Sequence, residues 1–127
     1  MLRVAAIPPF RATVAEVGGQ IALVSVSGEL DLYVENELRD ALASAAALNV
    51  TTVVVDVSGV SFLDSTACGI LVTEAKRMRR EKRGFVLVSN GNFASRVLGV
   101  AGIDQIVPVY PTLHAAFQRV LLVEPVQ

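Results

Sequence analysis

The chain has 127 residues and a net charge of −1, enough length for one domain with a hydrophobic core and too little positive charge for nonspecific nucleic-acid binding. Apolar residues make up 53% of it, yet no apolar run approaches the roughly 20 residues of a membrane-spanning helix. The stretch from Met1 to Pro9 is too short for a signal peptide, and a single cysteine excludes an internal disulfide. We therefore expect a cytoplasmic protein without membrane insertion.

The N-terminal region is expected to contain an arm, a hairpin and a helix. Residues 1–11 lack periodicity and include two consecutive prolines, which predicts a flexible arm. Residues 12–17 and 20–27 have the pattern of two strands joined by a glycine turn, and Gly28 to Asp31 end the second strand. Apolar residues at helical spacing between 34 and 48 predict the helix that follows.

The central segment changes from strand to helix. Thr51 to Val57 is a run of mostly β-branched residues, typical of a strand buried on both faces. The pair Ser58-Gly59 is expected to break this strand, and residues 60–63 carry the chain a little further. Asp64, Ser65 and Thr66 can each cap a helix, and apolar residues at spacings of three and four from 67 to 78 predict that helix.

Ser65 has two interpretations at this point. One is a helix-capping residue and nothing more, which is the commonest use of serine before a helix. The other is a site that takes a phosphate, because the free N–H groups and the dipole of a helix N-terminus favour negative charge. Spacing alone leaves both interpretations open.

A basic cluster follows in the same helix. Six of the eleven Lys and Arg residues lie between 76 and 83, and Gly84 is expected to end the helix. These cations complement the negative end of the helix dipole and solvate its exposed face. A role in docking a partner is the alternative.

The C-terminal part continues the alternation of strands and helices. Its predicted elements are a strand at 85–88, a short helix at 93–100 closed by Gly102, a strand at 106–109, and a helix at 113–122 with Pro111 in its first turn. The whole pattern predicts an α/β fold, a mixed and largely parallel sheet of about five strands with an N-terminal hairpin and about four helices. Because sites in such sheets form beyond the carboxyl ends of the strands, Asp31 and Asp64-Ser65 should meet at one edge.

The chain is poorly equipped for catalysis. It lacks both the G-x-x-x-x-G-K-[ST] and the G-x-G-x-x-G phosphate-binding motifs. His114, the only histidine, is expected at or near the surface, and Cys68 is expected to be a buried apolar residue, so they form no metal site. Asp31, Asp56 and Asp64 invite comparison with phosphate-accepting receiver domains, but the paired acids and the lysine of that class are missing. We expect no enzyme activity, no cofactor and no metal.

Two short motifs resemble a known family. Phe62-Leu63-Asp64-Ser65-Thr66 followed by Gly69-Ile70-Leu71 resembles the Asp-Ser-Ser/Thr-Gly signature of STAS domains, which are named for sulfate transporters and anti-sigma factor antagonists. Gly28-Glu29-Leu30-Asp31 before a helix resembles the family's second signature. With similar features in the C-terminal half, the resemblance covers about 12–122. It implies a single STAS domain there, with a tail at 123–127.

The resemblance also implies a switching cycle. In the bacterial antagonists the residue after the signature aspartate is a phosphorylated serine, and it falls on Ser65. The unphosphorylated protein would bind an anti-sigma factor with a histidine-kinase-like ATP fold and so free a sigma factor. That anti-sigma factor would phosphorylate Ser65, and a metal-dependent Ser/Thr phosphatase would restore the hydroxyl. Asp31, Asp64, Ser65 and Thr66 are assigned to partner binding.

One departure from the family pattern and two alternatives accompany this prediction. Ala67-Cys68 stands where the family usually has Gly followed by Leu, and the extra methyl group of Ala67 can hinder a close partner backbone. One alternative is a STAS interaction subunit of a transporter or of a stress-signalling complex, without a kinase cycle. The other is an enzyme or nucleotide-binding domain.

Overall fold

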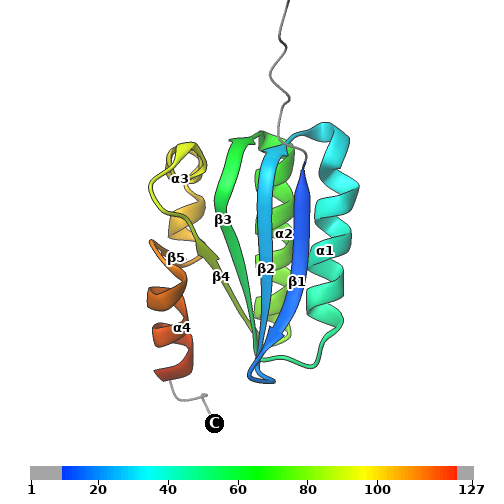
Figure 1. The fold of residues 1–127 in the computed structure, drawn as a ribbon, viewed down its shortest axis with the longest axis vertical. Coiled ribbons are helices and arrows are strands. Elements are labelled where there is room, and N and C mark those ends of the chain that lie inside the picture. The colour runs from blue at the N-terminus through cyan, green and yellow to red at the C-terminus, as the bar shows by residue number, and fades with distance from the viewer. Residues whose placement is uncertain (1–9, 123–127) are drawn as a thin grey trace, which may run out of the picture.

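A five-stranded mixed sheet forms the centre of the computed structural model, which describes residues 10–122 (Figure 1). The strands lie in the order in which they occur in the chain; the first is antiparallel to the second, and all other pairs are parallel. They are β1 (Arg11–Val17), β2 (Ile21–Leu30), β3 (Thr52–Leu63), β4 (Gly84–Val88) and β5 (Val109–Tyr110). The predicted α/β fold with an N-terminal hairpin is confirmed.

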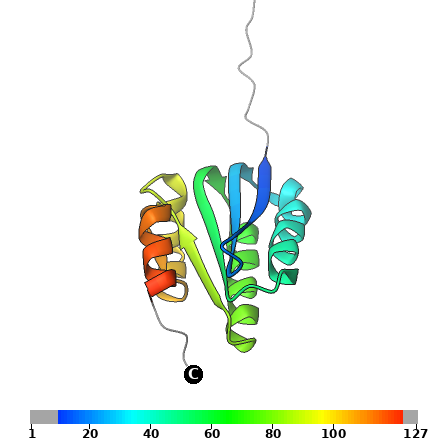
Figure 2. The same cartoon turned by 60° about the horizontal axis from the view of Figure 1, so that its bottom comes forward.

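Helices cover both faces of the sheet. Within residues 10–122 they are α1 (Glu35–Ala47), α2 (Ser65–Arg80), α3 (Phe93–Val100) and α4 (Leu113–Leu122), with two short 3-10 helices, η1 (Leu32–Val34) and η2 (Ile103–Gln105). The first three α-helices pack on one face and α4 packs on the other, as Figures 1 and 2 show. None of the helices in the described part of the chain is both long and apolar enough to cross a bilayer.

Strand β3 is buried on both faces, as its β-branched run predicts. Val53, Val55 and Val57 pack in the larger core, between the sheet and α1 to α3, whereas Val54 packs in the smaller core under α4. None of these four side chains is more than 1% exposed. Full burial of such a side chain contributes about 1.5–3 kcal/mol, so the strand that leads to Ser65 is firmly anchored.

The predicted break in this strand at Ser58-Gly59 is wrong. Strand β3 continues to Leu63, and β2 continues alongside it to Leu30. The pairing shifts by one residue between Ser25 and Ser27 and again between Gly28 and Glu29, where β3 accommodates an extra residue each time. These irregularities are β-bulges, which bend a strand without ending it.

The predicted end of the second helix is also wrong. Helix α2 ends at Arg80, Lys82 adopts a left-handed conformation with φ of 59°, and Gly84 begins β4. Glycine allows close packing at this strand start, because a Cβ atom on Gly84 would lie 2.8 Å from Thr52 Oγ1 of the neighbouring strand and would displace that side chain. The basic cluster therefore spans the last turns of α2 and the following turn.

Two C-terminal predictions need similar correction. The last strand is confined to Val109–Tyr110 instead of 106–109, because the amides of Ile106 and Val107 donate to the Ile103 carbonyl in a turn. Pro111 precedes α4 and does not lie in its first turn. Of the arm and tail predicted for 1–11 and 123–127, only residues 10 and 11 lie inside the described range, and Arg11 already belongs to β1.

Candidate functional site

Two aspartates follow neighbouring strands at the carboxyl edge of the sheet. Leu30 at the end of β2 pairs with Leu63 at the end of β3, so Asp31 and Asp64 come directly after adjacent strand ends. The backbone amide of Asp64 donates to the Leu30 carbonyl at 3.3 Å. The structure thus brings together the two sequence motifs, as expected for parallel neighbours.

Each of these carboxylates starts a helix. Asp31 Oδ1 accepts a hydrogen bond from the Tyr33 amide at 2.9 Å and caps η1. Asp64 is extended, with φ of −96° and ψ of 177°, and its Oδ1 accepts from the Ala67 amide at 2.9 Å. Asp64 is therefore the N-cap of α2. The interpretation of Ser65 as the capping residue is wrong.

Ser65 and Thr66 are the first two residues of α2, and both are exposed. Since Asp64 does the capping, the Ser65 hydroxyl lies outside that interaction. It stands beside the free backbone N–H groups of a sixteen-residue helix, where the dipole favours an anion.

Ser65 lies on a ridge between two grooves. The first groove, between α2 and α3, has a volume of about 770 Å³ and is lined mainly by apolar side chains, with Arg96 among them. The second, between α1 and α2, has a volume of about 500 Å³ and includes Thr66, Arg39 and Arg77. A partner that covers the serine is therefore placed next to the walls of both grooves.

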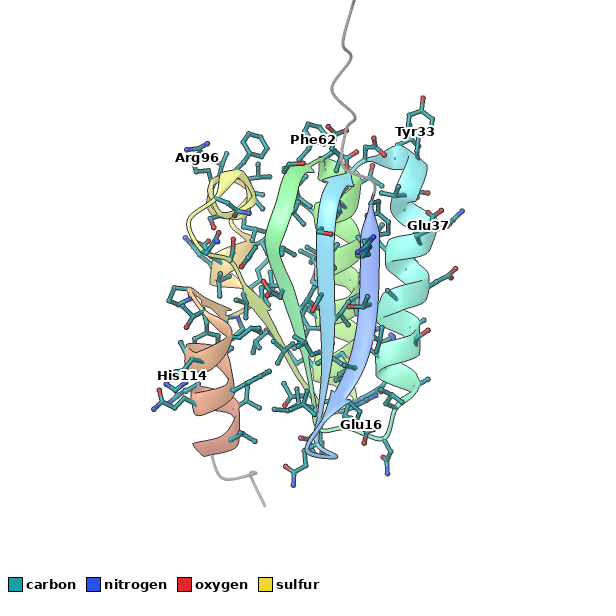
Figure 3. The ribbon with its side chains drawn as sticks, in the orientation of Figure 1. Glu16, Tyr33, Glu37, Phe62, Arg96 and His114 are labelled. Carbon is teal, nitrogen blue, oxygen red and sulfur yellow. The ribbon has the colours of Figure 1, made fainter. Side chains whose placement is uncertain are left out.

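Large apolar side chains are exposed around this edge. Phe62 stacks on Phe93 with ring centroids 6.4 Å apart, and the guanidinium of Arg96 lies 5.9 Å from the Phe93 centroid. Phe62 and Phe93 are each 41% exposed, and Tyr33 is 83% exposed. Figure 3 shows Arg96, Phe62 and Tyr33 at the same end of the molecule. Exposed apolar patches of this kind mark interaction surfaces.

Asn92 holds α3 against β3 next to this edge. Its Nδ2 donates to the carbonyls of Val57 at 3.2 Å, Ser58 at 3.0 Å and Val60 at 3.0 Å, in the bulged part of β3. Its Oδ1 accepts from the Ser95 amide at 3.1 Å and so caps α3. Sequence reasoning missed Asn92, Phe93 and Arg96; the single available signal was an asparagine directly before a predicted helix.

Cys68 and His114 do not present a reactive group at this edge of the sheet. Cys68 is buried, as predicted, and burial, followed by the nearby Asp64 carboxylate, raises the pKa of its thiol. His114 is exposed on α4, away from the edge that carries Phe62 (Figure 3). Nowhere in residues 10–122 do three His, Cys, Asp or Glu side chains gather as metal ligands.

A family comparison agrees with the two motifs at the sheet edge. The model of the STAS domain matches residues 12–116. The chain belongs to the STAS domain family. Among its relatives, the anti-sigma-F factor antagonist RsfB of Mycobacterium tuberculosis is 32% identical over 108 residues, which cover 85% of this chain and 87% of that protein.

Solved STAS structures have the same fold. An anti-sigma factor antagonist from Mycobacterium paratuberculosis is 30% identical, with a TM-score of 0.84 over 93% of this chain and 99% of that one. The Bacillus cell fate determinant SpoIIAA in its phosphorylated form matches with a TM-score of 0.66 at 20% identity, over 87% and 99% of the two chains. The second likeness shows the STAS fold alone.

Proposed function

We propose that this STAS domain, over residues 12–122, is a cytoplasmic anti-sigma factor antagonist. Unphosphorylated, it binds an anti-sigma factor that has Ser/Thr kinase activity, and a sigma factor is released. Phosphorylation of Ser65 ends this interaction, and a Ser/Thr phosphatase restores it. The names of the relatives support the antagonist role.

The observation that carries the proposal is the position of Ser65. Its side chain is exposed on the ridge between two grooves, at the first position of α2, and Asp64 caps the helix in its place. A kinase can therefore reach the hydroxyl without opening the fold. Transfer of the ATP γ-phosphoryl group to Ser65 Oγ releases the hydroxyl proton and ADP, and hydrolysis by the phosphatase returns serine and inorganic phosphate.

The same position supports an effect of the phosphate on binding and not on folding. The helix N-terminus favours the added charge by about 0.3–1 kcal/mol, and the adjacent Asp64 carboxylate opposes it. The stability of the free protein should therefore change little. In the complex, an unpaired phosphate is desolvated at a cost of several kcal/mol. A penalty of about 3 kcal/mol lowers affinity more than a hundredfold.

The neighbouring site residues supply partner contacts. Asp31 and Asp64 place two carboxylates on one edge, which suits a cationic group of the partner. Thr66 is exposed next to Ser65 and faces the groove between α1 and α2. In this role the chain is a binding module that serves as the kinase's substrate and performs no catalysis of its own.

Phosphorylation with purified components tests the proposal. The protein is incubated with each histidine-kinase-like anti-sigma factor of its source organism and ATP, and the label is mapped by mass spectrometry. We expect phosphate on Ser65 alone. Ser65→Ala should bind persistently and Ser65→Glu weakly, whereas Ser44→Ala, on the exposed face of α1, should behave as wild type.

Four results would contradict the proposal. Label on Ser58, Ser61 or Thr66 would move the switch to another residue. A phosphoprotein that is largely unfolded, or that binds as tightly as the unmodified form, would overturn the mechanism. A permanent complex without phosphate transfer would favour a STAS subunit of a transporter or stress-signalling assembly.

A further inference from the structure

The groove between α2 and α3 has the apolar composition of a surface that can bind a helix. Its walls are two helices that pack on the same face of the sheet, and its lining is mainly apolar. Val100, on the α3 wall, is 92% exposed, which is unusual for a large apolar side chain beside other exposed apolar groups. An amphipathic helix laid between two helices buries such a stripe by packing ridges into grooves.

Gly69 leaves the surface of α2 open to a close approach. It lies inside α2 and lines both grooves, although glycine is a poor residue for a helix interior. Its φ is not positive, and a Cβ atom built on it would meet nothing within 4 Å. Nothing within residues 10–122 therefore requires glycine at this position. Glycine without a side chain would let a partner backbone approach α2 closely at this position.

Arg96 supplies a charge without a counterpart. It is the single charged side chain among the described residues that line the α2–α3 groove. In the other groove, Arg39 is paired with Glu35 at 3.1 Å and Arg77 is paired with Glu74. Arg96 has no carboxylate within ion-pair distance in residues 10–122 and rests on the face of Phe93. An acidic side chain of a bound partner would form an ion pair with Arg96.

We propose that the α2–α3 groove receives an apolar helix of the anti-sigma factor, which passes close to Gly69 and pairs an acidic side chain with Arg96. This rests on the function proposed above and extends the interface from Ser65 along α2 to the end of α3. The position of Ser65 at the mouth of this groove gives the phosphate its effect, because the same helix must pass over it.

Two glycine variants test the close approach. Gly69→Ala and Gly99→Ala each add one methyl group to an exposed glycine in a helix, and the second glycine does not line the groove. Both should raise the melting temperature, because alanine is the better helix former. Only Gly69→Ala should weaken binding, by about tenfold or more for a clash equivalent to about 1.4 kcal/mol. Gly69→Ala with wild-type affinity would overturn the close approach.

A charge exchange tests the acidic partner residue. The probe is the purified anti-sigma factor that binds the wild-type chain, measured by titration calorimetry at low and high salt. Arg96→Glu should weaken binding roughly tenfold, since an attraction becomes a repulsion, and Arg119→Glu on α4 should not. Changing the paired acid of the partner to arginine should restore the affinity of Arg96→Glu.

The outcomes separate this proposal from the one it rests on. If no anti-sigma factor of the source organism binds the wild-type chain, the antagonist function itself fails. If one binds and is phosphorylation-sensitive, yet Gly69→Ala and Arg96→Glu bind as wild type does, the antagonist function stands and the groove proposal is wrong. Weakening of Arg96→Glu that no acid-to-arginine change rescues would refute the pairing.

Discussion

Replacing Asn92 should show how strongly α3 is held beside the site. Asn92→Ala removes the N-cap of α3, which contributes about 1 kcal/mol. It also removes the side-chain amide that donates to three carbonyls of β3. Because this amide has only two N–H hydrogens, its three contacts count as two hydrogen bonds, each worth about 1 kcal/mol. The total is about 3 kcal/mol. At about 4 °C per kcal/mol for a domain of this size, the melting temperature should fall by about 12 °C.

Asn92→Asp separates capping from the contact with β3. Aspartate caps a helix as well as asparagine does, but it has no N–H and sets a carboxylate against the same three carbonyl oxygens. We expect this variant to lose at least as much stability as Asn92→Ala. Urea denaturation at pH 7, followed by circular dichroism, measures both. If Asn92→Asp unfolds at the wild-type urea concentration, the β3 contact contributes nothing and the reasoning is refuted.

Three further predictions concern other parts of the chain. The guanidinium of Arg83 donates to three backbone carbonyls at the end of α1 and just after it. Arg83→Met should therefore lower the free energy of unfolding by about 3 kcal/mol, and a loss below about 1 kcal/mol would contradict this. Asp31→Ala removes one cap from η1 and should lower stability by about 1 kcal/mol at most while weakening partner binding; wild-type affinity in calorimetry would remove Asp31 from the site. The raised pKa of Cys68 means that the folded state holds the thiol proton more tightly than the unfolded state does. Stability should therefore decline as pH rises past about 9.0. In melting curves measured across this pH range, Cys68→Ala should show a smaller decline.

The local sequence pattern was sufficient to predict the fold class and the proximity of the two sequence motifs. The spacing of Ala67, Ile70, Leu71 and Met78 predicted α2, and all four side chains are buried. The expected strand order alone placed Asp31 near Asp64, because neighbouring parallel strands end at the same edge of the sheet. These features depend on periodicity and topology, which a single sequence carries.

Other features depend on neighbours that are distant in the chain. Three consecutive capping residues precede α2, and only the extended backbone of Asp64 decides which of them caps it. The passage of β3 through Gly59 depends on its approach to β2, where a Cβ atom would lie 2.9 Å from Ser27 Cβ. The position of Arg96 in the α2–α3 groove depends on how α3 packs against the sheet. Propensity scales hold no information on such contacts.

The capping of α2 by Asp64 has a consequence for how this protein can change over generations. Because residue 64 begins the helix, residue 65 is under little structural constraint, and a lineage can exchange its serine for another residue and keep the same domain. Under the proposed cycle, regulation through Ser65 can thus be lost or regained by a single codon change without passing through an unstable form. Position 64 has less freedom, because only a capping residue keeps the hydrogen bond to the Ala67 amide, and its loss costs about 1 kcal/mol. A library of variants scored for folding should tolerate most residues at 65 and few at 64.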